Sequence, residues 1–328
     1  MVISPSNYKN TFWQFNAHIQ TIYPALMRRV EQLSCRYERI NTPEHDFLEM
    51  DWYEQQSENL VILCHGLEGN SKRPYMLGMG NLFYINGFDI LSWNYRGCGM
   101  EMNKTMQFYH SGAIEDLDFI ISHALAKNRY HSITLIGFSL GGNLVLKYLG
   151  EKGKEIPHQI TGAVALSVPL DLESSCYEIM KPHNFLYHYR FLRQLKEKVL
   201  KKSQTIPSIL DHKPLVKIKT LYEFDNYYTA PIHGFIDAHD YYTKASSLSL
   251  LTTISKPTLI INAQNDTFLS DKCYPTEDLK NHSLVHLEIP QQGGHVGFYS
   301  DHHRGHYWSE IRTLEFIQKI NGTDPIFE

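Results

Sequence analysis

Short apolar segments recur along the chain and are separated by polar stretches of helical or loop character. They begin near residues 60, 88, 132, 160, 257 and 285, and the apolar character of each is nearly continuous. Strands that are buried on both faces have this pattern, and they are typical of parallel sheets covered by helices. The pattern therefore predicts an α/β fold with a mostly parallel central sheet flanked by helices.

Two regions depart from this rhythm. The segment HDFLEMDWY at 45 alternates only partly between apolar and polar residues, which favours an antiparallel edge strand. Between Asp171 and about Leu251 the strand segments stop, and YHYRFLRQLKEKVLKKSQ and AHDYYTKASSLSLL predict helices. We expect residues 171–250 to be a helical cap inserted into a single domain of residues 1–328, packed on the sheet.

Composition narrows the classes of protein. A chain of 328 residues with 42% hydrophobic residues can bury a full core. With 31 basic and 35 acidic residues it has no basic surplus to follow a nucleic acid backbone, so we expect no nucleic-acid partner. The five cysteines are an odd number without a C-x-x-C pair, which argues against a zinc or redox site and favours a reducing compartment.

The chain shows no pattern of a targeting or membrane-spanning segment. Its first residues lack a basic region followed by an apolar core, and no stretch approaches the ~18 apolar residues of a membrane span. We therefore expect a cytoplasmic protein.

The stretch around Lys196 to Lys202 predicts a basic amphipathic helix. We favour packing of its apolar side on the protein core, and peripheral contact of the cap with an anionic lipid surface stays an alternative.

The stretch SITLIGFSLGGNLVLKYLG, from Ser132 to Gly150, carries the strongest chemical signal. A strand-like run precedes Ser139 and a helix-like run follows it, so this serine lies on a tight strand-to-helix turn. Gly137 and Gly141 provide the small neighbours that such a turn requires. The G-x-S-x-G pattern in this context predicts that Ser139 is a catalytic nucleophile.

A serine nucleophile needs a base and an orienting acid. Asp266 follows the strand-like PTLIIN, and His295 lies in the glycine-rich QQGGHVGF. The chain order Ser, Asp, His is the order of α/β-hydrolases. Glu223 and Asp225 are acidic enough to compete for the orienting role, but their place in the cap argues against them.

An oxyanion needs two backbone donors, and the amides of Leu67 and Leu140 are the candidates. Leu67 belongs to LCHGLEGN, which follows the first central strand, and Leu140 follows the predicted nucleophile. In the same loop, His65 is expected to brace the turn by hydrogen bonding and not to act as the base. The carboxylate of Glu68 is expected to point away from the developing negative charge.

Several motifs together resemble one family, the YheT/EMB8-type α/β-hydrolases, whose animal relatives are the ABHD1/ABHD3-like proteins. They span nearly the whole chain: NAHIQTIYPALMRR at 16, CHGLEGNSKRPY at 64, NYRGCG at 94, YHSGAIEDL at 109, GFSLGGN at 137, EFDNYYTAPIHGF at 223, DAHDYY at 237, AQNDTF at 263 and GGHVGF at 293. The resemblance implies an α/β-hydrolase fold, charge-relay roles for Ser139, Asp266 and His295, and an esterase or lipase activity.

We thus expect a serine hydrolase that cleaves carboxylic esters through an acyl-enzyme, without a metal or organic cofactor. The resemblance favours small-molecule or lipid esters with short or medium acyl chains, such as monoacylglycerol. Two alternatives stay open: an acyltransferase that uses the same residues, and a non-catalytic binding protein of the same fold. The acyl chain length, the head group and the oligomeric state do not follow from the sequence.

Overall fold

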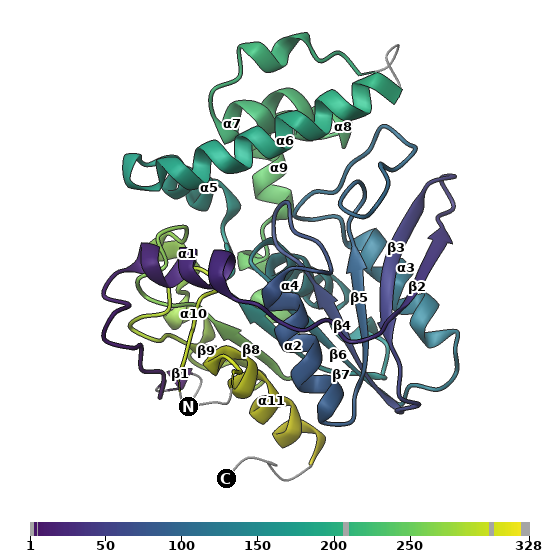
Figure 1. Ribbon diagram of the computed structural model, residues 1–328, viewed down its shortest axis with the longest axis vertical. Helices are drawn as coiled ribbons and strands as arrows, with labels where there is room; N and C mark the ends of the chain where they lie inside the picture. Colours follow the sequence, from purple (N-terminus) through teal and green to yellow (C-terminus); the bar gives the residue numbers. More distant parts are fainter. Residues whose placement is uncertain (1–2, 5, 206–209, 302–304, 323–328) are drawn as a thin grey trace.

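A computed structural model of the chain describes residues 3–4, 6–205, 210–301 and 305–322. Its centre is a sheet of nine described strands in the order β1-β9-β8-β7-β6-β4-β5-β3-β2, with helices on both faces (Figure 1). β3 pairs antiparallel with β2 and β5, and all other neighbours are parallel. The predicted α/β fold with a mostly parallel sheet is confirmed.

The elements have the following bounds. The strands are β1 (Ile3–Ser4), β2 (Arg36–Asn41), β3 (Phe47–Tyr53), β4 (Asn59–Cys64), β5 (Asp89–Asn94), β6 (Ser132–Phe138), β7 (Ile160–Leu166), β8 (Thr258–Ile261) and β9 (Val285–Glu288). The helices are α1 (Ala17–Met27), α2 (Pro74–Ile85), α3 (Ile114–Leu125), α4 (Leu140–Lys152), α5 (Leu172–Met180), α6 (Phe185–Thr205), α7 (Leu221–Phe224), α8 (Ala230–Ile232), α9 (Ala238–Ala245), α10 (Thr276–Leu279) and α11 (Trp308–Asn321). A π-helix, η4 (Asp225–Thr229), lies between α7 and α8, and the 3₁₀ segments are η1 (Gly153–Glu155), η2 (Pro182–Asn184), η3 (Lys213–Val216), η5 (Leu248–Thr253) and η6 (Asp271–Cys273).

The apolar runs form central strands because both faces of the sheet are covered. In β4, Leu60 and Ile62 belong to the core cluster that contains the apolar side chains of α3 and α4. Val61 and Leu63, which point to the other face, belong to the cluster that contains those of α2 and α11. Successive side chains of a strand alternate between faces, so a strand covered on both sides is apolar at every position.

The strand predicted at the sheet edge lies one position inside it. β3 lies between β5 and β2, and β2 is the edge strand. β2 was not predicted, because its sequence RYERIN leaves every residue partly or fully exposed and so lacks an apolar pattern. Edge strands keep a solvated side and tolerate such charged sequences.

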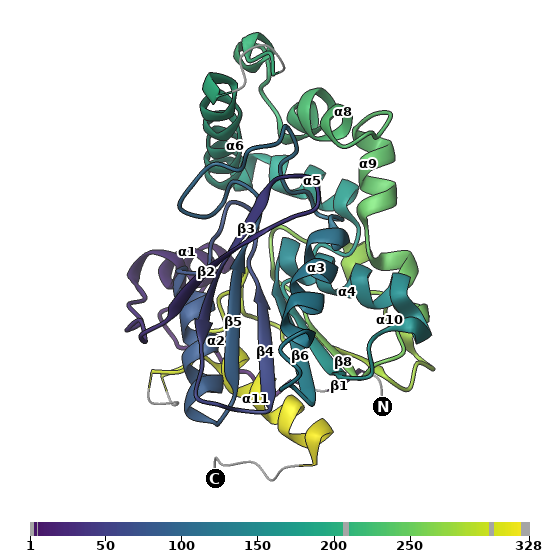
Figure 2. The same ribbon diagram turned by 90° about the vertical axis from the view of Figure 1, so that its right-hand side faces the viewer.

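The segment of residues 171–250, here called the cap segment, lies between β7 and β8 in sequence. Its described residues form helices and no strand, and they share an apolar cluster of their own. Figures 1 and 2 show α5 to α9 at one end of the sheet, above the ends of the parallel strands. Among the described helices, none combines the length and the apolar character needed to cross a bilayer.

The basic helix predicted in the cap segment is α6, and several of its lysines point inward. Lys198 Nζ lies 2.7 Å from Glu68 Oε1, Lys196 Nζ donates to the carbonyl of Ile218, and Lys202 Nζ donates to Asn103 Oδ1 at 2.6 Å. These three ammonium groups therefore bind to the protein itself.

Candidate active site

Ser139 lies on a sharp turn between β6 and α4, with φ 53° and ψ −119°. This is a strained conformation for a residue other than glycine, and such strain is concentrated at functional sites. A Cβ atom on Gly137 would come within 2.2 Å of the Gly141 carbonyl oxygen, and one on Gly141 within 2.3 Å of the Cys64 carbonyl oxygen. The turn is therefore as tight as the sequence predicts, and neither glycine can carry a side chain.

A chain of hydrogen bonds links the three residues that the sequence singles out. Nε2 of His295 lies 2.9 Å from Oγ of Ser139, and Nδ1 of His295 lies 2.7 Å from Oδ2 of Asp266. A carboxylate can only accept a hydrogen bond, so the Nδ1 atom that faces it carries the proton of a neutral imidazole. The Nε2 atom is then free to accept a hydrogen bond from the serine hydroxyl. The three side chains come from the loops after β6, β8 and β9. The carboxyl ends of these parallel strands lie at the same end of the sheet.

The Asp266 carboxylate is held rigidly. Its side chain is fully buried, and its Oδ1 accepts a hydrogen bond from the amide of Phe268 at 3.0 Å. The ring of Phe268 packs against the imidazole of His295 with 4.2 Å between the ring centroids. The aspartate and the imidazole are therefore fixed relative to each other from two sides.

The N-terminal helix α1 also fixes the histidine loop, and this contribution was not predicted. The amide of His295 donates to Oγ1 of Thr21 at 2.9 Å, and the amide of Gly293 donates to the side-chain oxygen of Gln20 at 2.9 Å. The next amide in the loop, that of Val296, donates to Oγ of Ser167 at 2.8 Å. The only sequence signal for α1 was the family-like NAHIQTIYPALMRR, which gives no contact partner.

Two carboxylates of the cap segment were alternatives for the orienting acid. Asp225 accepts hydrogen bonds from Oγ1 of Thr229 at 2.5 Å and from the hydroxyl of Tyr242 at 2.6 Å. Glu223 accepts from the amides of Lys219 and Thr220 at the start of α7. In the described part of the chain, the carboxylate bonded to His295 is that of Asp266.

The loop after β4 positions the other predicted groups. His65 is buried, its Nδ1 donates to the carbonyl of Gly66 at 2.8 Å, and its Nε2 accepts from the amide of Tyr95 at 3.3 Å. Burial lowers the pKa of His65 to about 3, so the ring stays neutral and braces the loop. Leu67 lies between His65 and Glu68 and borders the same cavities as Ser139.

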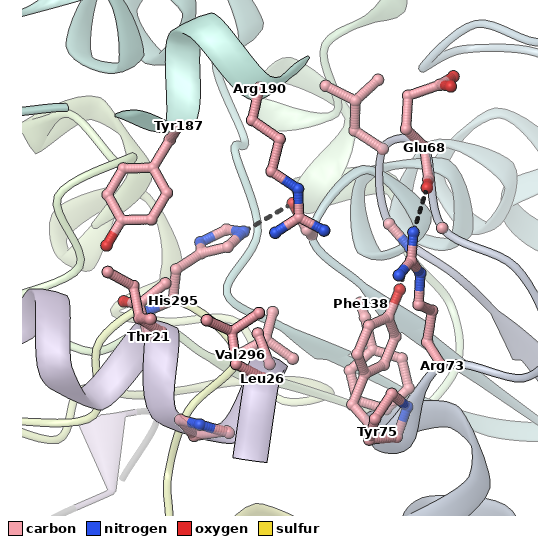
Figure 3. A pocket seen from close by; sticks show the side chains of 18 of the residues that line it. Thr21, Leu26, Glu68, Arg73, Tyr75, Phe138, Tyr187, Arg190, His295 and Val296 are labelled. Atoms are coloured by element: carbon pink, nitrogen blue, oxygen red, sulfur yellow. Dashed lines mark hydrogen bonds between the residues drawn. The ribbon is translucent and has the colours of Figure 1, made fainter. Parts of the chain in front are cut away.

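Glu68 turns its carboxylate away from the serine. The Oε1 atom of Glu68 forms an ion pair with Lys198 at 2.7 Å and accepts from the hydroxyl of Tyr109 at 2.7 Å. Figure 3 shows this carboxylate directed away from His295, while the backbone carbonyl of Glu68 accepts from Arg73. A negative charge that develops at Ser139 would therefore not face it.

Two cavities meet at Ser139. The first has a volume of about 380 Å³, and its lining includes Ser139, His295 and apolar side chains of α1 such as Leu26. Arg190 and Tyr187 reach into it from α6 (Figure 3). The second has a volume of about 120 Å³ and lies between the start of α4 and the cap segment. A substrate bonded to Ser139 can thus extend in two directions.

Comparisons with known proteins agree with this architecture. Residues 59–301 match the family model described as alpha/beta hydrolase fold. The chain is 33% identical to the protein named "Putative esterase YheT" of Escherichia coli (strain K12), covering 86% of this chain and 84% of that protein. It is 28% identical to phospholipase ABHD3 of Mus musculus, covering 89% of this chain and 73% of that protein.

A solved structure shows the same fold at lower sequence identity. The esterase Pf2001 of Pyrococcus furiosus superposes with a TM-score of 0.60 at 18% identity, covering 89% of this chain and 96% of that chain. The resemblance to the YheT/EMB8-type proteins is confirmed by these matches. The chain belongs to the α/β-hydrolase family, among the relatives of YheT and ABHD3, and is a hydrolase of the esterase and lipase type.

Proposed function

We propose that the protein is a serine hydrolase that cleaves carboxylic esters through an acyl-enzyme formed on Ser139. The observation that carries the proposal is the continuous hydrogen-bond chain from Ser139 Oγ through the imidazole of His295 to Asp266. A serine hydroxyl is a weak nucleophile on its own, and a base bonded to it with an oriented imidazole is the arrangement that activates it.

The reaction has two stages. His295 Nε2 accepts the hydroxyl proton while Ser139 Oγ bonds to the ester carbon, and the imidazolium then gives this proton to the departing alcohol oxygen. Asp266 keeps the imidazole in the correct tautomer and stabilises its charged form. In the second stage His295 takes a proton from water, the hydroxide attacks the acyl carbon, and the acid leaves as Ser139 regains its proton.

We assign the binding of the oxyanion to the backbone amides of Leu67 and Leu140, which donate hydrogen bonds to it. Both residues border the space next to Ser139, and Leu140 is the first residue of α4. Amides at a helix N-terminus carry partial positive charge and stabilise an oxyanion without reorganisation. The reaction needs no metal or organic cofactor.

The substrates proposed are small-molecule or lipid esters with short or medium acyl chains, such as monoacylglycerol. Mostly apolar side chains line both cavities, which suits the binding of acyl and other apolar groups. We include the cap segment, as an insertion within the single domain of residues 1–328, in this substrate site because α6 contributes to both cavities. We place the protein in the cytoplasm.

A fluorophosphonate probe tests the proposal. Such probes phosphonylate an activated serine, so the wild type should be labelled and Ser139→Ala should not. Ser175→Ala is the matched control, because Ser175 is buried beside the second cavity and bonds to the thiol of Cys273. Equal labelling of the wild type and Ser139→Ala would refute the assignment and favour a non-catalytic binding role.

A further inference from the structure

The two cavities that meet at Ser139 differ in the reactive groups that they border. His295, the proposed base, borders the first cavity. Leu140, whose amide is proposed to bind the oxyanion, borders the second. Under the proposed function, His295 must reach the oxygen of the departing alcohol to protonate it. The alcohol part of the ester therefore extends into the first cavity, and the acyl part extends into the second.

The second cavity contains a carboxylate that this reaction does not use. Asp225 begins the π-helix η4, and its side chain borders the cavity together with Thr229 and Tyr242. The residue is half-buried, and it borders the cavity. Single π-helical turns are rare and frequently occur at functional sites.

Asp225 has hydrogen-bond capacity to spare. Its two oxygens receive one hydroxyl each, from Thr229 and Tyr242. A carboxylate has about four acceptor positions, so roughly half of this capacity faces no donor among the described residues. An acceptor position that is partly removed from solvent costs free energy unless a ligand or water fills it.

The charges around the cavity also favour a donor. Among the described residues that line it, Asp225 is the only acidic one, and neither lysine nor arginine is present. His110 is neutral, because burial lowers its pKa to about 3. No ion pair with Asp225 occurs among the described residues, and burial raises the pKa of its carboxyl to about 6 despite the two hydroxyl donors.

We propose that the second cavity binds an acyl group that carries a hydrogen-bond donor at its far end, a hydroxyl or an ammonium, and that Asp225 accepts this donor. The proposal rests on the proposed function, because it assigns the acyl side of the same reaction. The rings of Tyr241, Tyr242 and Phe268 line the path and contact the carbon chain. Asp225 thereby favours, among esters of the proposed class, those whose acyl group ends in such a donor.

Matched esters of one chromogenic alcohol test this proposal. At each chain length from three to eight carbons, an ω-hydroxyacyl ester and an ω-ammonioacyl ester are compared with the ester in which a methyl group replaces the donor. At the length that reaches Asp225, we expect kcat/KM of the wild type to favour a donor-ended ester by about 10-fold or more, as for a hydrogen bond to a charged group.

Variants assign the preference to one side chain. Asp225→Leu should reverse the preference in favour of the methyl-ended ester, while Asp225→Asn should keep part of the preference for the hydroxyl and lose that for the ammonium. Glu223→Gln is the matched control, because this carboxylate lies two residues away and bonds to the start of α7. Glutamine fills the same capping role, so the wild-type preference should persist.

The outcomes separate the two proposals. Turnover of the methyl-ended ester that depends on Ser139, with no preference for a donor at any chain length, would overturn the role of Asp225 and leave the proposed function intact. Unchanged ratios in Asp225→Asn and Asp225→Leu would also overturn it. If no ester were turned over and no serine labelled, the proposed function and this inference would fall together.

Discussion

Asp266 is a buried carboxylate and Asp225 is a half-buried one that borders the same cavity as Ser139, and they differ in what they contact. Asp266 lies in the loop after β8 and bonds to an imidazole and a backbone amide. Asp225 lies in the cap segment and bonds to two hydroxyl groups of the same segment. An imidazole can carry a proton to and from the reaction, whereas the hydroxyls of Thr229 and Tyr242 donate their hydrogen bonds to the carboxylate and do not contact Ser139. The partner of each carboxylate therefore decides whether it can support catalysis.

The largest effect is expected from removing the charge of Asp266. In Asp266→Asn the amide can donate to Nδ1 and favour the tautomer with its proton on Nε2, which cannot accept from Ser139. We expect kcat to fall by about 10⁴-fold with substrate binding largely kept, as for the same change in serine proteases. Steady-state kinetics on one chromogenic ester measure this loss.

Asp225→Asn is the counterpart in that experiment. We expect a far smaller loss of kcat, because Asp225 does not contact the imidazole. Circular dichroism shows whether both variants are folded. If Asp225→Asn were the more damaging change in folded protein, the orienting acid would lie in the cap segment.

The second prediction concerns stability and pH. The pKa of Asp225 is raised to about 6 in the folded protein, above the ordinary value of 3.8. The folded state therefore binds the carboxyl proton of Asp225 more tightly than the unfolded state. The free energy of unfolding falls as pH rises from the ordinary pKa of 3.8 through the folded-state pKa of about 6. The full penalty is about 2 to 3 kcal/mol, and about 1 kcal/mol of it develops between pH 5 and pH 8.

Asp225→Asn should remove this penalty. We expect the variant to be more stable than the wild type at pH 8 by about 2 kcal/mol, and the advantage to shrink toward pH 5. Urea denaturation at both pH values measures the free energies of unfolding. A variant that is equally destabilised at both values would mean that Asp225 is uncharged or paired with a cation.

A smaller effect is expected from Tyr242, whose hydroxyl donates to Asp225 at 2.6 Å. Tyr242→Phe should lower the free energy of unfolding by about 1 to 2 kcal/mol at pH 8, where the carboxylate is charged, and by less at pH 5. Tyr241→Phe is the matched control, because the hydroxyl of Tyr241 bonds to the neutral Ser111. Its loss should be independent of pH in the same denaturation experiments, and a pH dependence shared by both variants would contradict the assignment.

The parts of the site that the sequence predicts are those with local signals. Ser139 is marked by glycines within a few positions, and the central strands are marked by continuous apolar runs. The contact of Thr21 with His295 joins residues 274 positions apart and has no local signal. The different partners of Asp225 and Asp266 also depend on packing, since each aspartate has an aromatic residue within two positions in the sequence and this pattern does not show what the carboxylate contacts. The edge strand β2 was missed because an exposed strand needs no apolar pattern.

The central claim is that ester cleavage proceeds through a covalent bond to Ser139. Rapid acid quenching of the wild type during turnover of a chromogenic butanoate ester, followed by intact-mass measurement and peptide mapping, tests it directly. We predict one butanoyl group per chain, located on Ser139, and no adduct in Ser139→Ala, which should also lose turnover. An adduct on another residue, or activity kept in Ser139→Ala, would contradict the account.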